Sequence, residues 1–185
     1  MTEKIKENAT YDDLVTAPED KIAELVEGSL YLSPQPAIRH VNATSVLAGY
    51  LNPAFHRGAG GPGGWWIFVE PELHLGENVF VPDLAGWKRE RLPELPEGVG
   101  IMVAPDWVCE ALSPSTEKFD RLVKMPQYAA AGVSHLWIVD ATLRRLEVHG
   151  RLERAWILLE QHSGTALVCA PPFEVIAIEL GALWG

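Results

Sequence analysis

The order of strand-length and helix-length segments is the feature that most constrains how this chain can fold. An apolar run at residues 107–112 has the length of a buried strand, and a helical stretch over 117–131 follows it. Gly132 is placed to end that helix, and a second apolar run of strand length occupies residues 135–139. A strand, a helix and a strand in this order favour an α/β domain built on a mixed sheet.

The N-terminal segments fit the same architecture. Thr10 can cap a short helix over 11–15, and Glu27-Gly28 marks the turn of a hairpin over 22–33. Apolar side chains then recur at helical spacing over 38–55, which predicts the first long helix.

A glycine-rich loop at 58–64 separates that helix from segments with a periodicity of two. These segments predict three strands in an antiparallel ribbon: 65–69, 72–75 and 79–87. We expect the strand that carries Asp83 to lie beside 107–112. Short strands are also expected in the C-terminal third, over 145–149, 155–159, 166–169 and 175–178, before a helical cap over 180–184. Residues 1–9 are taken as a flexible leader and 10–185 as a single domain.

Composition limits the partners and the compartment. The chain has 185 residues and a net charge of −10, so it repels polyanions as a whole and any nucleic-acid site must be local. Cys109 and Cys169 lie in apolar surroundings, which favours reduced core thiols and a cytoplasmic location. No apolar stretch reaches the roughly 18 residues that a membrane span needs, so no membrane partner is expected.

Two acidic residues at predicted strands are the first candidates for chemistry. Asp83 follows Pro82 after an apolar run, and Glu110 lies inside an otherwise apolar strand, where an unpaired carboxylate is costly. A hard cation such as Mg²⁺ would satisfy both, and the carbonyl of Ala111 could be a third ligand. Alternatively, Asp83 is a turn former and Glu110 is paired with a core Arg or His.

The helix after Glu110 carries a polar stripe. Asp120, Lys124 and Tyr128 are spaced four residues apart and share one face. An ammonium group at Lys124 could orient or help deprotonate an attacking water and offset charge on a phosphoryl transition state. The alternative is an ordinary Asp–Lys helix pair.

Several separated motifs of the sequence agree in order and spacing with those of one family. The chain resembles the Uma-type restriction endonuclease family of the PD-(D/E)XK nuclease superfamily over nearly its whole length. The motifs that carry the resemblance are Glu24-Leu25-Val26-Glu27-Gly28, Pro82-Asp83, Glu110-Ala111-Leu112-Ser113-Pro114-Ser115-Thr116, Asp120, Lys124, Tyr128-Ala129, Gly132-Val133 and Trp137-Ile138-Val139-Asp140.

The resemblance implies a restriction-endonuclease-like core with a mixed sheet flanked by helices and additional antiparallel strands. It also implies hydrolysis of DNA phosphodiester bonds with Mg²⁺, for which Mn²⁺ can substitute. Glu24, Asp83 and Glu110 would hold the metal. The superfamily's usual lysine position is Leu112 here, and Lys124 matches the lysine that takes this role in the family.

Other polar residues carry weaker signals. His74 could support the site together with Asp120 and Tyr128, although its strand position equally allows the outer face. His40 is expected to be a surface or satisfied histidine, and Ser113, Ser115 and Thr116 are expected to cap the second long helix. The few basic residues that could contact DNA are Arg39, Arg57, Lys88, Arg89, Arg91, Lys118 and Arg121.

Three functions follow as hypotheses. The first is a metal-dependent DNA endonuclease that acts as a homodimer if it follows other nucleases of this fold. The second is a catalytically inactive interaction or oligomerisation module on the same fold. The third is a nuclease that acts on a nucleic acid held by a partner protein. Metal binding separates the second hypothesis from the other two.

Overall fold

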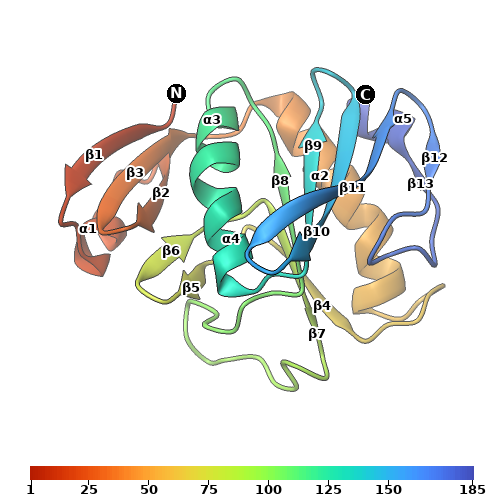
Figure 1. Cartoon of the computed structure of the whole chain (residues 1–185), viewed down its shortest axis with the longest axis horizontal. Coiled ribbons are helices and arrows are strands. Elements are labelled where there is room, and N and C mark those ends of the chain that lie inside the picture. Colours follow the sequence, from red (N-terminus) through yellow and green to blue (C-terminus); the bar gives the residue numbers. More distant parts are fainter.

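A computed structural model describes all residues, 1–185, and its centre is a six-stranded mixed sheet (Figure 1). Its strands in spatial order are β11 (Ala155–Ser163), β10 (Arg145–Leu152), β9 (His135–Asp140), β8 (Trp107–Ala111), β7 (Leu84–Lys88) and β4 (Trp65–Val69). The pair β8–β9 is parallel and the other pairs are antiparallel. The predicted mixed α/β sheet is therefore confirmed, and so is the placement of the strand after Asp83 beside 107–112.

Two smaller sheets and the helices complete the molecule. The five-stranded sheet contains β1 (Glu3–Glu7), β3 (Ser29–Pro34), β2 (Lys21–Val26), β6 (Asn78–Phe80) and β5 (Leu73–Leu75), and the third sheet contains β12 (Leu167–Val168) and β13 (Ile178–Glu179). The α-helices are α1 (Tyr11–Val15), α2 (Ile38–Leu51), α3 (Glu117–Phe119), α4 (Met125–Ala131) and α5 (Leu180–Trp184), and the π-helical turns are η1 (Asn52–His56) and η2 (Asp120–Lys124). None of these helices has the length and apolar content that crossing a membrane requires.

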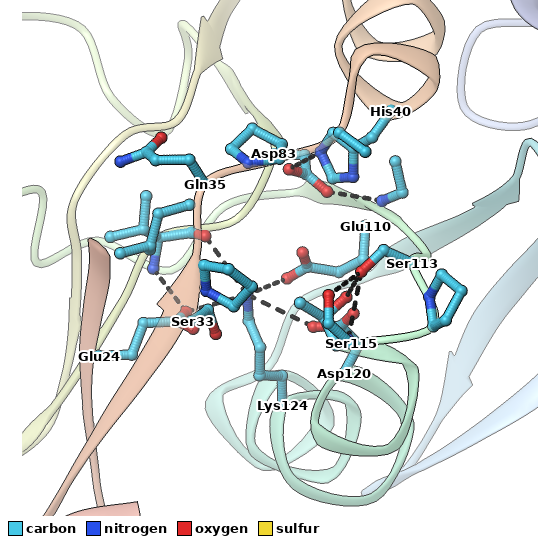
Figure 2. Close-up of a pocket in the computed structure, with 18 residues that line it drawn as sticks. Glu24, Ser33, Gln35, His40, Asp83, Glu110, Ser113, Ser115, Asp120 and Lys124 are labelled. Atoms are coloured by element: carbon cyan, nitrogen blue, oxygen red, sulfur yellow. Dashed lines mark hydrogen bonds and ion pairs between the residues drawn. The ribbon is translucent and has the colours of Figure 1, made fainter. Parts of the chain in front are cut away.

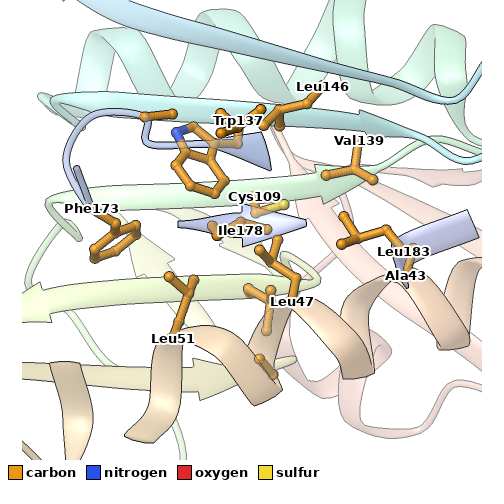
Figure 3. Packing of buried hydrophobic residues seen from close by; sticks show 14 of the residues in the cluster. Ala43, Leu47, Leu51, Cys109, Trp137, Val139, Leu146, Phe173, Ile178 and Leu183 are labelled. Carbon is orange, nitrogen blue, oxygen red and sulfur yellow. The ribbon is translucent and has the colours of Figure 1, made fainter. Parts of the chain in front are cut away.

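Both faces of the central sheet are buried, because the strands at its centre are apolar on both sides. On one face, α2 and α5 pack against side chains such as Cys109, Trp137 and Val139 (Figure 3). On the other face, Tyr128 and Phe119 of the segment α3–η2–α4 pack against Leu136 and Ile138.

The register of β8 then fixes the direction of its one acidic side chain. Glu110 lies opposite Ile138 in the parallel pair, and Cys109 lies opposite Trp137. Because neighbours in register share a face of the sheet, Glu110 points towards η2 and α4, whereas Cys109 points towards α2.

The predicted strand 79–87 is wrong as a single element. The chain leaves the five-stranded sheet after Phe80 and enters the central sheet at Leu84, so Val81, Pro82 and Asp83 form the junction. Pro82 has no amide hydrogen to donate to a ladder, and the Val81 amide donates instead to Glu24 Oε1 at 2.9 Å. Asp83 therefore lies where two sheets meet and not within a strand.

Four further expectations need correction. The leader contains β1, which pairs with β3, and the helix expected over 38–55 is α-helical only to Leu51. Pro53 interrupts the hydrogen-bond ladder there, and the Arg57 amide bonds to the carbonyl of Asn52, five residues back. Cys169 is exposed, so only Cys109 is a core thiol. The strand expected over 175–178 is reduced to Ile178–Glu179, because Val175 is solvent-exposed and unpaired.

Candidate functional site

A cavity of about 230 Å³ opens at the junction of the two large sheets, beside the start of α2 and the helical segment α3–η2. Its lining includes four acidic side chains, one lysine and one histidine: Glu24, Asp83, Glu110, Asp120, Lys124 and His40. Figure 2 shows that these side chains come from separate elements and converge on the same space. The structure therefore brings together the three metal ligands and the lysine that the family resemblance implies.

Lys124 is the centre of the ion pairs in this pocket. Its Nζ lies 2.8 Å from Glu110 Oε1 and 2.9 Å from Glu24 Oε1, and it donates to the Val81 carbonyl at 3.3 Å. Only 3% of its side chain is exposed. Burial alone would lower the pKa of Lys124, but the carboxylates of Glu110 and Glu24 outweigh burial and hold that pKa well above its ordinary value. Lys124 is therefore an ammonium at neutral pH.

Glu110 is buried in the middle of this network. Tyr128 donates its hydroxyl to Glu110 Oε1 at 2.7 Å, on the same oxygen that contacts Lys124. Burial raises the pKa of Glu110 well above its ordinary value, and Lys124 offsets this only in part because Asp120, Asp83 and Glu24 add negative charge. Burial and the Glu110 carboxylate also raise the pKa of the Tyr128 hydroxyl, which keeps it protonated as a donor.

Asp120 faces the same pocket from the beginning of η2. Its Oδ1 lies 3.9 Å from Lys124 Nζ, at the outer limit of an ion pair. Burial raises the pKa of Asp120 to about 7, and Lys124 opposes that shift. Four acidic groups thus share one permanent cation in a poorly solvated space.

Asp83 is held by a different set of partners. Its Oδ1 lies 2.6 Å from His40 Nε2, and its Oδ2 accepts the Ala111 amide at 2.6 Å. Burial would lower the pKa of His40, but the hydrogen bond to Asp83 reverses this and raises it. The His40 Nδ1 atom is buried without a hydrogen-bond partner. His40 was expected to be a surface or satisfied histidine, and the sequence contains no sign that its partner is Asp83.

The local winding of the helix presents Asp120 and Lys124 to the pocket. Residues 120–124 form a π-helical turn in which the Met125 amide bonds to the Asp120 carbonyl, five residues back. Pro126 follows directly and cannot donate to a regular helical ladder, which explains the widened turn. Pro126 was the sequence signal for this irregularity, whereas regular helical spacing had been expected.

His74 was expected to support the site, and Ser113 and Thr116 were expected to cap the helix that follows them. His74 lies outside the pocket, with its Nε2 2.6 Å from Glu72 Oε1, and Tyr11 donates to the same oxygen at 2.7 Å. The suggestion that His74 supports the site is therefore wrong, because β5 turns this side chain towards α1. Ser113 and Thr116 line the pocket, and the Ser113 hydroxyl accepts the Thr116 amide as a cap at 3.2 Å.

Most of the basic residues proposed for DNA contact serve structural roles. The cluster 88–91 lies at the far end of β7 from Asp83, roughly 17 Å away along an extended strand. There, Arg89 stacks on Trp66 and Arg91 pairs with Asp106. Arg39 and Lys118 differ, since both are exposed, form no ion pair and flank residues that line the pocket.

The donor atoms of the pocket suit a hard divalent cation, but they are not arranged as a finished metal site. All four acids supply oxygen, the ligand atom that Mg²⁺ prefers, and their charge exceeds that of Lys124. No three histidine, cysteine or acidic side chains in the structure form a ready metal-binding group. The ammonium of Lys124 instead occupies the space between Glu24 and Glu110, so a cation that binds both acids competes with it.

Comparisons with known proteins agree with this architecture. A solved structure described as a putative nuclease belonging to DUF820, from Anabaena variabilis ATCC 29413, has a similar fold with a TM-score of 0.72. It is 23% identical in sequence, and the alignment covers 95% of this chain and 97% of that chain. No curated protein matches the chain. The model of the family Uma2, described as "Putative restriction endonuclease", matches residues 9–180. Because this match spans nearly the whole sequence, the chain belongs to the Uma2 family.

Proposed function

We propose that this protein is a metal-dependent endonuclease that hydrolyses phosphodiester bonds in DNA, using Mg²⁺ with Mn²⁺ as a substitute. The observation that carries the proposal is the excess of buried acid around Lys124. Four carboxyl groups face one ammonium, and the pKa of Glu110 and of Asp120 is raised because burial leaves their charge uncompensated. A divalent cation would supply the missing positive charge. Membership of the Uma2 family supports nuclease activity.

Asp83 and Glu110 would hold the metal, with Glu24 as a further carboxylate and the Ala111 carbonyl beside them. When bound, Mg²⁺ activates water for attack on the phosphorus and offsets the negative charge that develops on the phosphoryl group. The chain itself orients the acids: His40 and the Ala111 amide fix the two oxygens of Asp83, and Tyr128 fixes Glu110 through its hydroxyl.

Lys124 would position the attacking water and stabilise the phosphate by donating hydrogen bonds. Glu110 and Glu24 hold the pKa of Lys124 above its ordinary value, and an ammonium donates hydrogen bonds but has no free electron pair to accept a proton from water. Glu110 and Glu24 contribute most to keeping Lys124 charged, and Asp120 contributes less. Lys124 therefore acts through its charge and its hydrogen bonds.

Contact with the DNA backbone would come from Arg39 and Lys118. Both are exposed and unpaired, and each lies next to pocket-lining elements, the start of α2 and the start of α3. Two phosphate contacts are few, which fits a chain with a net charge of −10. Changing both residues to alanine should lower DNA affinity and reduce its salt dependence without changing metal affinity.

The test is cleavage of supercoiled plasmid with Mg²⁺, with Mn²⁺ and with a chelator. Wild type should nick or linearise the plasmid only with metal, and Asp83→Asn and Glu110→Gln should lose this activity. Glu147→Gln is the matched control, because Glu147 is a buried acid outside the pocket. Equal cutting by all four proteins would contradict the proposal.

A negative cleavage result has two distinct meanings. Metal binding without cutting would favour a nuclease that needs a partner protein or another nucleic acid. The absence of both metal binding and cutting would favour the interaction or oligomerisation module.

A further inference from the structure

Two short loops line the pocket, and their polar groups differ in how far they are satisfied. The loop 113–116 joins β8 to α3, and its Ser113 hydroxyl lies 2.7 Å from that of Ser115 and 3.1 Å from that of Thr116. The loop 34–37 joins β3 to α2, and Gln35 carries its only polar side chain. The hydroxyls of the first loop thus bond to one another, whereas Gln35 has no such neighbour in its own loop.

Gln35 is the one polar side chain of the pocket lining without a partner in the chain. The residue is exposed, its amide forms no hydrogen bond, and in Figure 2 that amide lies apart from the ion pairs around Lys124. Every other polar side chain of the lining has a hydrogen bond or an ion pair: Glu24, Ser33, His40, Asp83, Glu110, Ser113, Ser115, Thr116, Asp120 and Lys124. An amide donor and an amide acceptor are therefore free beside the acids.

The backbone holds Gln35 in a narrow range of conformations. Pro34 and Pro36 flank it, and a residue that precedes a proline is restricted to extended conformations. A loop that is already restricted loses little conformational freedom when a ligand binds, so a contact made by Gln35 requires little ordering of its backbone.

The chemistry of the free amide favours a base over a phosphate. Phosphate oxygens only accept hydrogen bonds, so they would leave the amide oxygen of Gln35 unpaired, and four acidic side chains line the same pocket. Adenine presents an acceptor, N7, beside a donor, N6, on its major-groove edge, and a glutamine amide complements both. Guanine presents two acceptors at the same edge, so it matches only half of the amide.

We propose that Gln35 determines sequence preference by donating to N7 and accepting from N6 of an adenine beside the cleaved phosphodiester, in the major groove of duplex DNA. This inference rests on the proposed nuclease function, because the pocket must hold that phosphodiester. Arg39 and Lys118 would contact the backbone, which positions the duplex but carries no sequence information. Gln35 would supply that information.

Sequencing the ends of DNA cut from a randomised pool tests the assignment. Wild type should enrich adenine at least about fivefold at one position beside the cut, and Gln35→Ala should lose this enrichment. Gln35→Arg should change the preferred base to guanine, because arginine donates to both O6 and N7 of guanine. A merely structural role of Gln35 would not produce this change of base. Gln161→Ala is the matched control, since Gln161 is an exposed glutamine outside the pocket, and it should keep the adenine preference.

Urea denaturation checks that these variants report on recognition and not on folding. The midpoint for Gln35→Ala should equal that of wild type, because the amide has no partner in the chain to lose. Wild-type ends without a base preference, or an adenine preference that Gln35→Ala retains, would overturn the proposal.

A binding selection lets this inference and the nuclease function fail separately. Duplexes bound from a randomised pool, with Ca²⁺ as the cation, report base preference without relying on cleavage. Adenine enrichment that Gln35→Ala removes, in a protein that does not cut, would support the role of Gln35 and contradict the nuclease function. Cutting without a preference that depends on Gln35 would do the reverse. A wild type that neither binds nor cuts DNA would overturn both.

Discussion

Two polar clusters involve the same helical segment, α3–η2–α4, and they have opposite charge balance. In the pocket, Lys124 is the one lysine beside four acidic side chains. In the second cluster, Glu147 of β10 contacts two arginines and one histidine: Arg121 binds both of its oxygens at 2.9 Å, and Arg145 and His149 lie at 3.0 and 3.2 Å. Arg121 and Lys124 are only three positions apart in the sequence, yet they belong to different clusters.

The pKa values of the two central acids differ in direction for this reason. Burial raises the pKa of Glu110 and is not fully offset, whereas Arg121 outweighs burial at Glu147 and lowers its pKa. The charge of Glu147 is thus compensated, and its ion pair with Arg121 connects the helical segment to the sheet. The pocket cluster lacks positive charge, which is the property that a cation-binding site needs before its cation arrives.

The largest expected effect comes from removing the single cation of the pocket. Lys124→Met should lower the free energy of unfolding by about 3–5 kcal/mol at pH 8, because it leaves Glu24 and Glu110 buried without a positively charged partner. The loss should shrink at pH 5, where the acids can protonate. Urea denaturation of wild type and Lys124→Met at both pH values measures the loss of unfolding free energy. An equal loss at pH 5 and pH 8 would contradict the explanation that the unpaired carboxylate charges cause it.

Glu147→Gln should separate stability from activity. The substitution leaves Arg121 and Arg145 without the carboxylate of Glu147. The free energy of unfolding should therefore fall by about 2 kcal/mol near pH 7. Plasmid cleavage should persist, because Glu147 does not line the pocket. Loss of cleavage in a folded Glu147→Gln protein would show that the two clusters are not independent.

The pH dependence of stability should have opposite signs at the two clusters. The pKa of Asp120 is about 7 in the folded chain, compared with about 3.9 in an unfolded one. The folded state therefore binds the extra proton, and stability from this group is present at low pH and is lost as pH rises through about 7. Asp120→Asn should reduce this decline in chelator-treated protein.

Glu147 provides the comparison for that experiment. The pKa of Glu147 is lowered in the folded chain. Its contribution to stability is therefore present at pH values above the unfolded-chain pKa of about 4.3, and it is lost as the pH falls below that value. Denaturation series from acid to neutral pH should show the two contributions separately. An unchanged pH profile in Asp120→Asn would argue against a proton shared among the pocket acids.

His40→Gln should have the smallest effect of these changes. The imidazole orients Asp83 from 2.6 Å, and groups that orient metal ligands typically change metal affinity by about 10–100-fold. We expect a change near the lower end of this range, because the Ala111 amide still holds the second oxygen of Asp83. Metal titration measures it, and unchanged affinity would remove His40 from the site.

Much of the fold could be predicted because strand and helix periodicities are local. The strand–helix–strand unit around Glu110 and the hairpin at Glu27-Gly28 are examples, and the structure confirms both. The break at Pro82 was missed because residues 79–87 read as a single apolar run. The sequence does not reveal that the chain passes between two sheets there.

The site could also be predicted only where its residues stand out locally in the sequence. Asp83, Glu110 and Lys124 stand out in the sequence, and the family resemblance adds Glu24. The pairing of His40 with Asp83 joins residues 43 positions apart, and no local pattern reports it. The contact of Arg121 with Glu147 was also not predictable, since it depends on how the helix packs over β10.

Calorimetric titration with Mg²⁺ tests most directly whether the acid-rich cluster is a cation site. Wild type and Glu147→Gln should bind with the same affinity, whereas Asp83→Asn and Glu110→Gln should bind at least about tenfold more weakly. Wild type that binds no Mg²⁺ or Mn²⁺, or affinities that these two pocket variants leave unchanged, would contradict the account.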